Sequence, residues 1–145
     1  MLVVKIRNLM VKEVKTFEAH ASVYEAVKLM NENKIGCLVI IRDGKIVGIL
    51  TERDLLERVL EKCKNPKETS VFEVMTRHVI TGNTEMEIPE AAHIMFENKV
   101  KKLPLVEGNK VVGIVTLTDI ARAASVDEDT VELVAKLSNL HIMGH

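Results

Sequence analysis

The chain has 145 residues, with 20 lysines and arginines against 21 aspartates and glutamates, which gives a formal charge of −1. This length is typical of one ordinary domain and is enough to bury a hydrophobic core without disulfide or metal staples. The near-neutral charge and an aromatic content of 3% argue against a nucleic-acid binder that depends on a broad positive field or on aromatic stacking.

The cysteines and the hydropathy pattern indicate where the protein is found. Cys37 and Cys63 are too few for a disulfide framework. Lys5 and Arg7 interrupt the first apolar residues, so the long apolar segment of a secretory signal is missing. No stretch approaches the ~20 apolar residues of a membrane-spanning helix. We therefore expect a cytoplasmic protein that does not enter a membrane.

In chain order, the first expected elements are a short extended segment over 14–17 and a helix. Ser22 and Glu25 have the spacing of a capping box, and apolar residues follow at helical intervals. Asn33 and Lys34 mark the expected end of this helix.

Two strands and a second helix are expected next. Residues 37–41 are apolar throughout, which is typical of a strand covered on both faces. Asp43 and Gly44 predict a tight hairpin turn into a return strand over 46–50. A second helix is expected to begin at Thr51.

The stretch 63–69 is polar and contains a proline, so we expect a linker there. Ser70 and Glu73 form a second capping-box signal ahead of a short helix. Residues 103–106 predict another strand. Because Pro104 has no amide hydrogen, we expect it at a sheet edge or at a strand start.

The last segment, residues 125–145, predicts a helix with one apolar stripe. Ser125 opens a third helix-start signal, and Val131, Val134 and Leu137 recur at helical spacing. Two alternatives remain open: the helix packs on its own domain, or it contributes to a dimer contact.

The chain contains an internal duplication with a shift of 65 residues. Aligning residues 10–55 with 75–120 without a gap gives 16 identities in 46 positions, and nine of the other 30 pairs exchange one aliphatic residue for another. A repeat of this kind indicates two copies of one structural unit. A cleft between two equivalent units is a natural place for a ligand.

One motif occurs in both copies, where the return strand meets the second helix. It reads Gly48-Ile-Leu-Thr51-Glu-Arg53-Asp54 and Gly113-Ile-Val-Thr116-Leu-Thr118-Asp119. Thr and Asp at this spacing can cap a helix, which is a structural role. They also suit a nucleotide, because the helix start attracts phosphate and the carboxylate can accept hydrogen bonds from two ribose hydroxyls. The glycine permits another group to approach the strand closely.

Together these features resemble a tandem pair of cystathionine β-synthase-type (CBS) domains. The duplication, the β-α-β-β-α order, the repeated motif and the Asn-Lys-aliphatic segment before Leu103-Pro-Leu-Val106 carry the resemblance over residues 8–123. It implies a mixed α/β (α+β) fold of two repeats related by a pseudo-twofold axis, with sheets packed together and helices outside. The expected boundaries are 8–62 for the first repeat, 63–69 for the linker, 70–124 for the second repeat and 125–145 for the tail.

The resemblance implies a regulatory module that binds AMP, ADP, ATP or S-adenosylmethionine in two composite clefts and modulates a partner protein. Each cleft takes its Thr-x-x-Asp from one repeat, and its first strand and the start of its second strand from the other. The first cleft would use Thr51, Arg53, Asp54, Ile80, Lys101 and Lys102. The second would use Lys15, Gly36, Cys37, Thr116, Thr118 and Asp119.

The two clefts differ in charge. The first gathers Arg53, Lys101 and Lys102, and charge-assisted bonds to phosphate are strong. The second has Thr118 in place of the arginine. We therefore expect the first cleft to prefer a phosphorylated nucleotide, and the second to take a less charged adenosine compound, to bind weakly or to stay empty.

Partners and competing functions follow from the same residues. The resemblance implies a homodimer through the helix faces after Thr51 and Thr116, and an effector protein that the sequence does not identify. Two other functions stay open: an interaction subunit without a ligand, and a nucleic-acid binder that uses the lysines between Lys99 and Lys110. No nucleophile–base pair is visible in the sequence, so we do not expect an enzyme. His141 and His145 have the four-residue spacing of a helical metal pair, but two ligands make only a weak site, so we expect no metal site.

Overall fold

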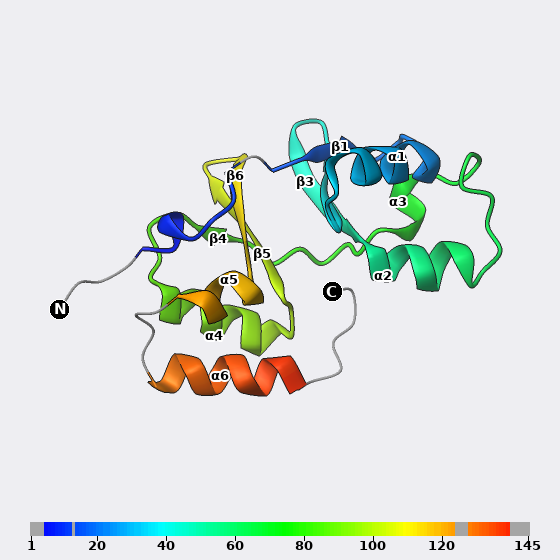
Figure 1. Ribbon diagram of the computed structural model, residues 1–145. Coiled ribbons are helices and arrows are strands. Elements are labelled where there is room, and N and C mark those ends of the chain that lie inside the picture. The colour runs from blue at the N-terminus through cyan, green and yellow to red at the C-terminus, as the bar shows by residue number, and fades with distance from the viewer. Residues whose placement is uncertain (1–4, 13, 124–127, 140–145) are drawn as a thin grey trace. The chain divides into compact units, whose positions relative to one another are not determined.

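The computed structural model describes residues 5–12, 14–123 and 128–139, which form two compact units (Figure 1). Residues 15–79 make up the first-repeat unit. The second-repeat unit contains the described residues 5–12, 14, 80–123 and 128–139. Each unit encloses a hydrophobic core of its own.

The first-repeat unit follows the order β-α-β-β-α and ends in a further short helix. Its elements are β1 (Thr16–Glu18), α1 (Val23–Asn33), β2 (Cys37–Arg42), β3 (Lys45–Thr51), α2 (Glu52–Leu55), its π-helical continuation η2 (Leu56–Leu60), and α3 (Val71–Val74). The second-repeat unit has the same order, preceded by a 3₁₀ helix and followed by a C-terminal helix. Its elements are η1 (Ile6–Asn8), β4 (Gly82–Asn83), α4 (Ile88–Asn98), β5 (Lys102–Glu107), β6 (Lys110–Thr116), α5 (Leu117–Arg122) and α6 (Glu128–Asn139).

Both units contain a three-stranded sheet of the same topology, in the orders β1-β2-β3 and β4-β5-β6. The first strand pairs in parallel with the middle strand, and the hairpin partner of the middle strand pairs antiparallel. The apolar run at residues 37–41 is the middle strand β2, in which Leu38 and Ile40 are fully buried. These observations confirm the predicted α+β class and the β-α-β-β-α repeats.

Local sequence explains where these elements begin and end. The Ser22 hydroxyl accepts a hydrogen bond from the Glu25 amide at 3.1 Å, and α1 ends where Lys34 adopts a left-handed φ of 52°. In the first hairpin, Asp43 and Gly44 have φ values of 52° and 75°. Positive φ at both positions is the geometry of a type I′ turn, whose twist suits a two-residue hairpin. The predicted helix end and turn are therefore confirmed.

Pro104 lies in the middle strand β5, so its predicted position at a sheet edge or strand start is wrong. In the first-repeat unit, the amide of Val39 at the equivalent position donates to the Lys15 carbonyl at 3.2 Å, and the parallel ladder starts at Thr16. Pro104 has no amide to donate, and the parallel ladder of its unit starts at Gly82, one repeat position later. A shortened β4 therefore accommodates the proline.

A short segment from outside each repeat completes each unit. In the second-repeat unit, Val11 and Ile114 exchange backbone hydrogen bonds of 2.9 and 3.1 Å. In the first-repeat unit, Thr76 and Ile49 exchange two bonds of 2.9 Å at the equivalent positions. The compact units are thus offset from the sequence repeats, because the segment at the start of each repeat joins the other repeat's sheet.

The glycine of each repeated motif accommodates a methionine from this segment. A Cβ atom at Gly48 would overlap Met75 Sδ and would lie 2.8 Å from the Thr76 carbonyl oxygen. A Cβ atom at Gly113 would lie 2.5 Å from Met10 Sδ. The predicted close approach at these glycines is confirmed, but a side chain of the protein makes it.

The polar stretch 63–69 lies within the first-repeat unit instead of between the units. The Pro66 carbonyl accepts a hydrogen bond of 3.0 Å from the Tyr24 amide, so the stretch satisfies a free donor at the start of α1. At the start of α3, Glu73 accepts a 2.8 Å bond from the Ser70 amide, as the capping box predicts. This bond holds the pKa of Glu73 below its ordinary value.

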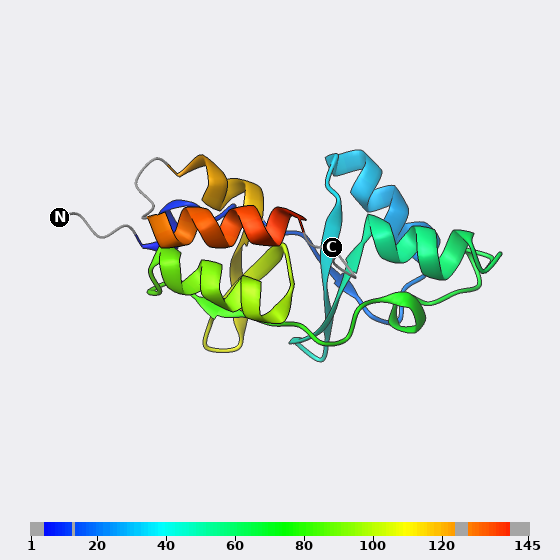
Figure 2. The same ribbon diagram turned by 90° about the horizontal axis from the view of Figure 1, so that it is seen from below.

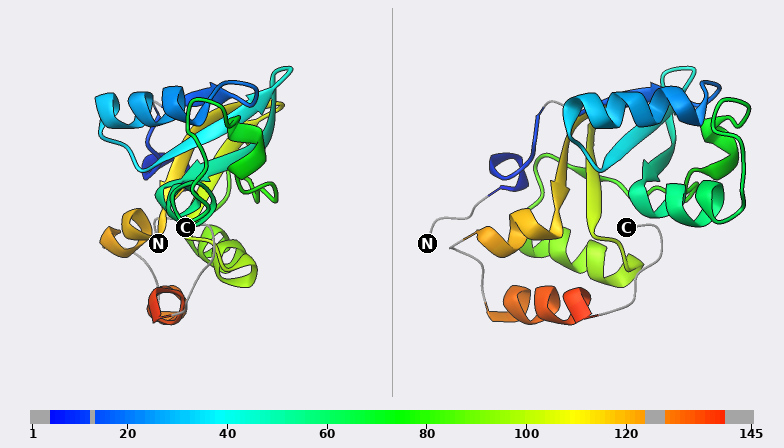
Figure 3. Two further views of the ribbon diagram at one scale, coloured as in Figure 1. Left: turned by 90° about the vertical axis from the view of Figure 1, so that its right-hand side faces the viewer. Right: turned by 45° about the vertical axis from the view of Figure 1, so that its right-hand side comes forward.

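The C-terminal helix α6 packs on its own unit, as the first of the two alternatives for the tail predicts, and a dimer contact of this helix stays a prediction. It contacts α4 and α5, and Leu137 is buried in the core that they share. Figure 2 shows α6 running alongside α4, and the left view of Figure 3, along the α6 axis, shows it between α4 and α5. In the helix after Thr116, Leu117 and Ile120 are buried in this core, whereas Thr118, Ala121 and Arg122 are exposed, and the homodimer contact through this helix stays a prediction. The start signal at Ser125 lies outside the described residues.

Candidate functional site

The carboxylate of Asp54 is fully engaged inside the first-repeat unit. Its Oδ2 accepts a 2.9 Å hydrogen bond from the Thr51 amide, and the Thr51 hydroxyl accepts a 3.3 Å bond from the Asp54 amide. Its Oδ1 accepts a 2.9 Å bond from the Thr76 hydroxyl. With a relative exposure of only 1%, Asp54 has little surface left for a ligand.

Arg58 adds a positive charge to this cluster. Its guanidinium lies 3.7 Å from Asp54 Oδ1 and donates to the carbonyls of Val74 and Met75 at 3.2 and 2.9 Å. A buried carboxylate requires such partners because desolvation of an isolated charge is costly. Asp54 and Arg58 therefore attach the start of α2–η2 to the segment that follows α3.

The equivalent carboxylate of the second-repeat unit, Asp119, is only partly engaged. Its Oδ2 accepts a 2.8 Å bond from the Thr116 amide, and the Thr116 hydroxyl accepts a 3.2 Å bond from the Asp119 amide. The 65-residue shift places Val11 where the first unit has Thr76, and Ala123 where it has Arg58. Among the described residues, none donates a hydrogen bond or ion pair to Asp119 Oδ1.

The two motifs therefore form the same kind of helix cap, but the residues that surround their aspartates differ. Both form the reciprocal capping box that the sequence predicts. Asp54 is closed off by protein partners, whereas Asp119 is half-buried and keeps one oxygen available to an external donor.

The start of each second strand lies beside the motif of the same unit. Cys37 is paired opposite Thr51 in the β2–β3 ladder, and Lys102 opposite Thr116 in the β5–β6 ladder. The Lys101 carbonyl accepts a 2.8 Å bond from the first amide of α5, and the Gly36 carbonyl accepts a 3.2 Å bond from the first amide of α2. In the second-repeat unit, two lysines of the strand start thus flank the motif.

The other predicted site residues are spread over both units. Arg53 is exposed and lies 3.9 Å from Glu57, Thr118 is exposed, and Ile80 is half-buried against the core of its unit. Lys15 is exposed, and its backbone carbonyl serves the β1–β2 ladder. Each predicted composite cleft combines residues of both units, and that combination stays a prediction.

Thr76 and Arg58 are the functional residues that sequence reasoning missed. The repeat alignment holds the signal, because the second copy has side chains without polar atoms at both equivalent positions. Comparing hydrogen-bonding capacity across the duplication would have indicated that the two aspartates differ.

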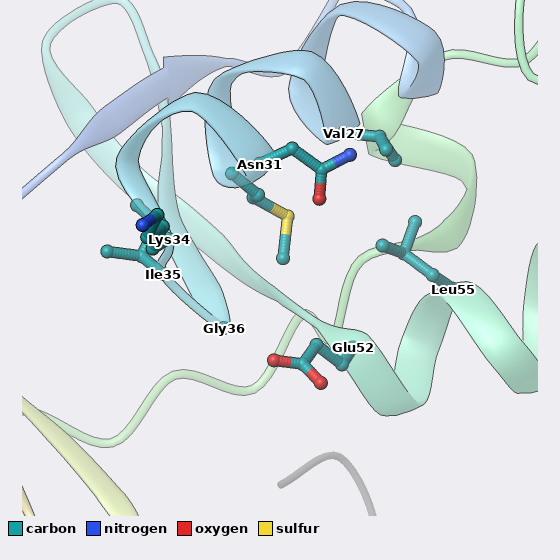
Figure 4. Close-up of a pocket in the computed structure, with 8 residues that line it drawn as sticks. Val27, Asn31, Lys34, Ile35, Gly36, Glu52 and Leu55 are labelled. Atoms are coloured by element: carbon teal, nitrogen blue, oxygen red, sulfur yellow. The ribbon is translucent and has the colours of Figure 1, made fainter.

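A pocket of about 420 Å³ lies beside the first motif, between the end of α1 and the start of α2 (Figure 4). It is lined by Val27, Met30, Asn31, Lys34, Ile35, Gly36, Glu52 and Leu55. Glu52 of the motif and the predicted site residue Gly36 line this pocket, whereas Thr51 and Asp54 do not.

Within the described ranges, no three Asp, Glu, His or Cys side chains gather closely enough to hold a metal ion. None of the helices in the described part of the chain has the length and apolar character that crossing a bilayer requires.

The duplicated unit with a capped Thr-x-x-Asp in each copy defines a tandem-repeat protein with two related half-sites. The sequence profile of the CBS domain matches residues 6–61 and 71–126. The chain therefore belongs to the CBS-domain family.

Individual relatives agree with this assignment. The CBS domain-containing protein YhcV of Bacillus subtilis is 28% identical over 137 residues, which cover 94% of this chain and 97% of YhcV. The crystal structure of the CBS domain protein TA0289 from Thermoplasma acidophilum superimposes with a TM-score of 0.79 at 28% identity, over 94% of this chain and 77% of that one. Inosine-5′-monophosphate dehydrogenase of the same organism is 37% identical over 114 residues, which cover 78% of this chain and only 22% of the enzyme.

Proposed function

We propose that this protein is a non-catalytic regulatory module that binds an adenosine nucleotide and modulates a partner protein. The family assignment supports a module of this kind, and its match to a minor part of a nucleotide-metabolising enzyme is consistent with a role apart from catalysis. The observation that carries the proposal is the open carboxylate oxygen of Asp119 beside a capped helix start.

In this proposal, Asp119 holds the ribose. An ionised carboxylate accepts hydrogen bonds from two adjacent hydroxyls, and hydrogen bonds to charged groups contribute about 1.5–3 kcal/mol each. Asp54 is a poor candidate for the same role, because a ribose would have to displace the Thr76 hydroxyl and compete with Arg58. The proposal therefore gives preference to the second motif over the first.

Lys101 and Lys102, which the family resemblance assigns to the first cleft, are proposed here to meet the phosphate at the second motif instead, because Lys102 is paired with Thr116. Both are half-buried at the strand start that flanks Thr116, and their ammonium groups supply the charge-assisted bonds that phosphate favours. A nucleotide that carries phosphate should therefore bind better than adenosine at this half-site. Lys15, Gly36 and Cys37 remain the residues proposed to complete it from the other repeat.

The test is isothermal titration of AMP, ADP, ATP and S-adenosylmethionine into the wild type, Asp119→Ala and Asp54→Ala. We expect one nucleotide per chain, at least about tenfold weaker binding for Asp119→Ala, and an unchanged Kd for Asp54→Ala. Glu97→Ala, at an exposed position of α4 outside both predicted clefts, is the surface control and should bind like the wild type. Titrations are made at a temperature where circular dichroism shows every variant folded.

Two results would contradict this assignment. Loss of binding in Asp54→Ala alone would place the ribose at the first motif. Absence of heat and of thermal stabilisation with all four compounds would instead favour the interaction subunit, in which both aspartates act only as helix caps.

A further inference from the structure

The turn end of the β2–β3 hairpin carries an exposed basic cluster, formed by Arg42, Lys45 and Arg77 around the ring of Phe72. The guanidinium carbons of Arg77 and Arg42 lie 4.2 and 5.7 Å from the centre of this ring, within the range of a cation–π contact. Lys45 is paired directly opposite Arg42 in the β2–β3 ladder. The cluster lies entirely within the first-repeat unit, and its three cations are exposed.

This basic cluster is separate from the candidate nucleotide site. The hairpin turn and the start of α2 lie at opposite ends of β3 (Figure 1). Along β2, Arg42 stands at one end of the strand and Cys37, which is paired with Thr51, stands at the other, about 16 Å away. A ligand of the cluster would therefore be additional to the proposed nucleotide.

The three cations have no acidic partner within the described part of the chain. None of the described carboxylates forms an ion pair with Arg42, Lys45 or Arg77. The carboxylate of Glu73, next to Phe72 in α3, is engaged by the Ser70 amide at 2.8 Å. The pairing of Arg42 with Lys45 also places like charges directly opposite each other, which destabilises an antiparallel pair. An external anion would relieve this repulsion.

The second-repeat unit has an equivalent place at the turn end of its own hairpin. At the start of α3, the Val71 amide donates to the Ala21 carbonyl at 2.9 Å. At the start of η1, the Ile6 amide donates to the Met86 carbonyl at 2.8 Å. The 65-residue shift relates these two bonds to each other. The surroundings of α3 can therefore be compared position by position with those of η1.

Carboxylates stand at this equivalent place. Glu107 is paired opposite Lys110 in the β5–β6 ladder, so opposite charges face each other there. Glu85 forms an ion pair with Arg7. The second-repeat unit thus supplies its own acidic partners, whereas the first-repeat unit has basic or aromatic residues at the same positions. The shift pairs Glu107 with Arg42, Glu85 with His20 and Arg7 with Phe72.

We infer that the basic cluster is a docking site for an acidic segment of the regulated partner protein. Carboxylates of this segment would take the place that Glu85 and Glu107 fill in the second-repeat unit. Guanidinium groups suit this role because they bind carboxylates through paired, charge-assisted hydrogen bonds. The inference rests on the proposed function for the existence of a partner protein, and it is independent of the nucleotide.

The geometry around Phe72 favours a peptide over a nucleic acid. Arg77 Nη2 donates to the Phe72 carbonyl at 3.4 Å, and its guanidinium lies against the Phe72 ring. These contacts hold the guanidinium in place, so less side-chain entropy is lost when an anion binds. Because two guanidiniums already contact the ring, it is not free to stack on a nucleobase.

The probe is a capped, fluorescent decaglutamate peptide, titrated into the full chain at low ionic strength and followed by fluorescence anisotropy. We expect saturable binding to the wild type, at least tenfold weaker binding to Arg42→Glu, and weaker binding as salt is added. Arg42→Glu introduces the residue type found at position 107, and it places opposite charges across the ladder from Lys45. It should therefore not lower the thermal unfolding midpoint. A loss of binding without a loss of stability identifies a binding role.

The matched control variant is Lys12→Gln/Lys62→Gln, which lowers the net charge as much as Arg42→Glu does, at two exposed positions outside the cluster. It should bind decaglutamate like the wild type, and a decaglutamine peptide should not bind. Arg42→Glu should keep the nucleotide affinity of the wild type. Failure of the peptide test and failure of the nucleotide titration are therefore distinguishable.

Several results would overturn the inference. Absence of peptide binding, or unchanged binding to Arg42→Glu, would show that the cluster does not hold carboxylates. Equal weakening in the control variant would show that the peptide responds only to net charge. Tighter binding of a single-stranded oligothymidylate of the same charge, lost in Arg42→Glu, would make the cluster a nucleic-acid site. If sedimentation shows a dimer that Arg42→Glu converts to monomers, a second copy of this chain occupies the cluster.

Discussion

Two aspartates with identical local sequence roles differ because of residues distant in the chain. Asp54 and Asp119 make the same cap, but only Asp54 meets a hydroxyl and a guanidinium at its second oxygen. A buried carboxylate with several partners contributes to stability through the whole cluster, whereas a half-exposed cap contributes through one or two bonds.

This difference predicts unequal effects on stability. Asp54→Ala should lower the free energy of unfolding by about 3 kcal/mol, because it leaves the buried Thr51 amide unpaired and removes the partner of Arg58. Asp119→Ala should lower it by about 1 kcal/mol, the typical effect of losing a helix cap. Urea unfolding monitored by circular dichroism measures both.

The equivalent substitutions Thr76→Val and Val11→Ala serve as controls at the position that distinguishes the two repeats. Thr76→Val should account for part of the Asp54→Ala effect, and Val11→Ala should leave the Asp119 cap intact. Equal losses for the two aspartate variants would contradict the proposed division of roles.

At the scale of elements, the segments that contain Met10 and Met75 each join the sheet of the other repeat, and glycine–methionine contacts hold them there. A Cβ atom at Gly48 would meet both the Met75 side chain and the Thr76 carbonyl at 2.8 Å, whereas the three atoms nearest to a Cβ atom at Gly113 all belong to the Met10 side chain. A flexible side chain can move away from an added methyl group, and a backbone carbonyl held in a strand pair cannot.

Shortening the neighbouring methionine should therefore relieve an alanine at position 113 more than an alanine at position 48. Gly48→Ala and Gly113→Ala should each destabilise by about 1–3 kcal/mol through overpacking. In the Met10→Ala background, Gly113→Ala should become nearly neutral. In the Met75→Ala background, Gly48→Ala should keep most of its cost.

Double-mutant cycles in urea separate these terms. If shortening the methionine rescues both glycine variants equally, the Thr76 carbonyl does not restrict Gly48.

The sequence predicts those elements whose conformation depends on neighbouring residues. It does not predict features that depend on contacts between residues distant in the chain. The cap at Ser22, the end of α1 at Lys34 and the Asp43-Gly44 turn depend on local backbone preferences, and the sequence predicts all three. Pro104 was assigned an edge position because the shortened β4 that tolerates it was not visible in the sequence.

The same reasoning explains the candidate site. The Thr-x-x-Asp motifs could be located from the duplication alone. Which aspartate is open depends on Thr76, which reaches Asp54 across 22 residues of chain, and no local pattern records that contact.

At the scale of the whole molecule, the two units differ in continuity. The first-repeat unit is one uninterrupted segment, whereas the second-repeat unit also requires residues from before the first repeat. Ile6 is fully buried in the second unit's core, and its amide donates a 2.8 Å hydrogen bond to the Met86 carbonyl.

Removal of residues 1–12 should therefore destabilise the second-repeat unit more than the first-repeat unit. We expect amides of β5 and β6 to lose hydrogen-exchange protection, and amides of β2 and β3 to keep theirs. Ile6→Ala should give the same pattern with a smaller loss, about 2–4 kcal/mol. Equal loss of protection in both units would show that the segment supports the whole molecule.

The segment of residues 5–12, which belongs to the second-repeat unit, also sets an order of folding events during synthesis. The contiguous residues 15–79 can fold as soon as they have left the ribosome. Ile6 and Met10, although made earlier, have no sheet to join until β6 has emerged about a hundred residues later. Ile6 and Met10 are thus translated well before they can be buried, and until then their apolar side chains remain accessible to chaperones.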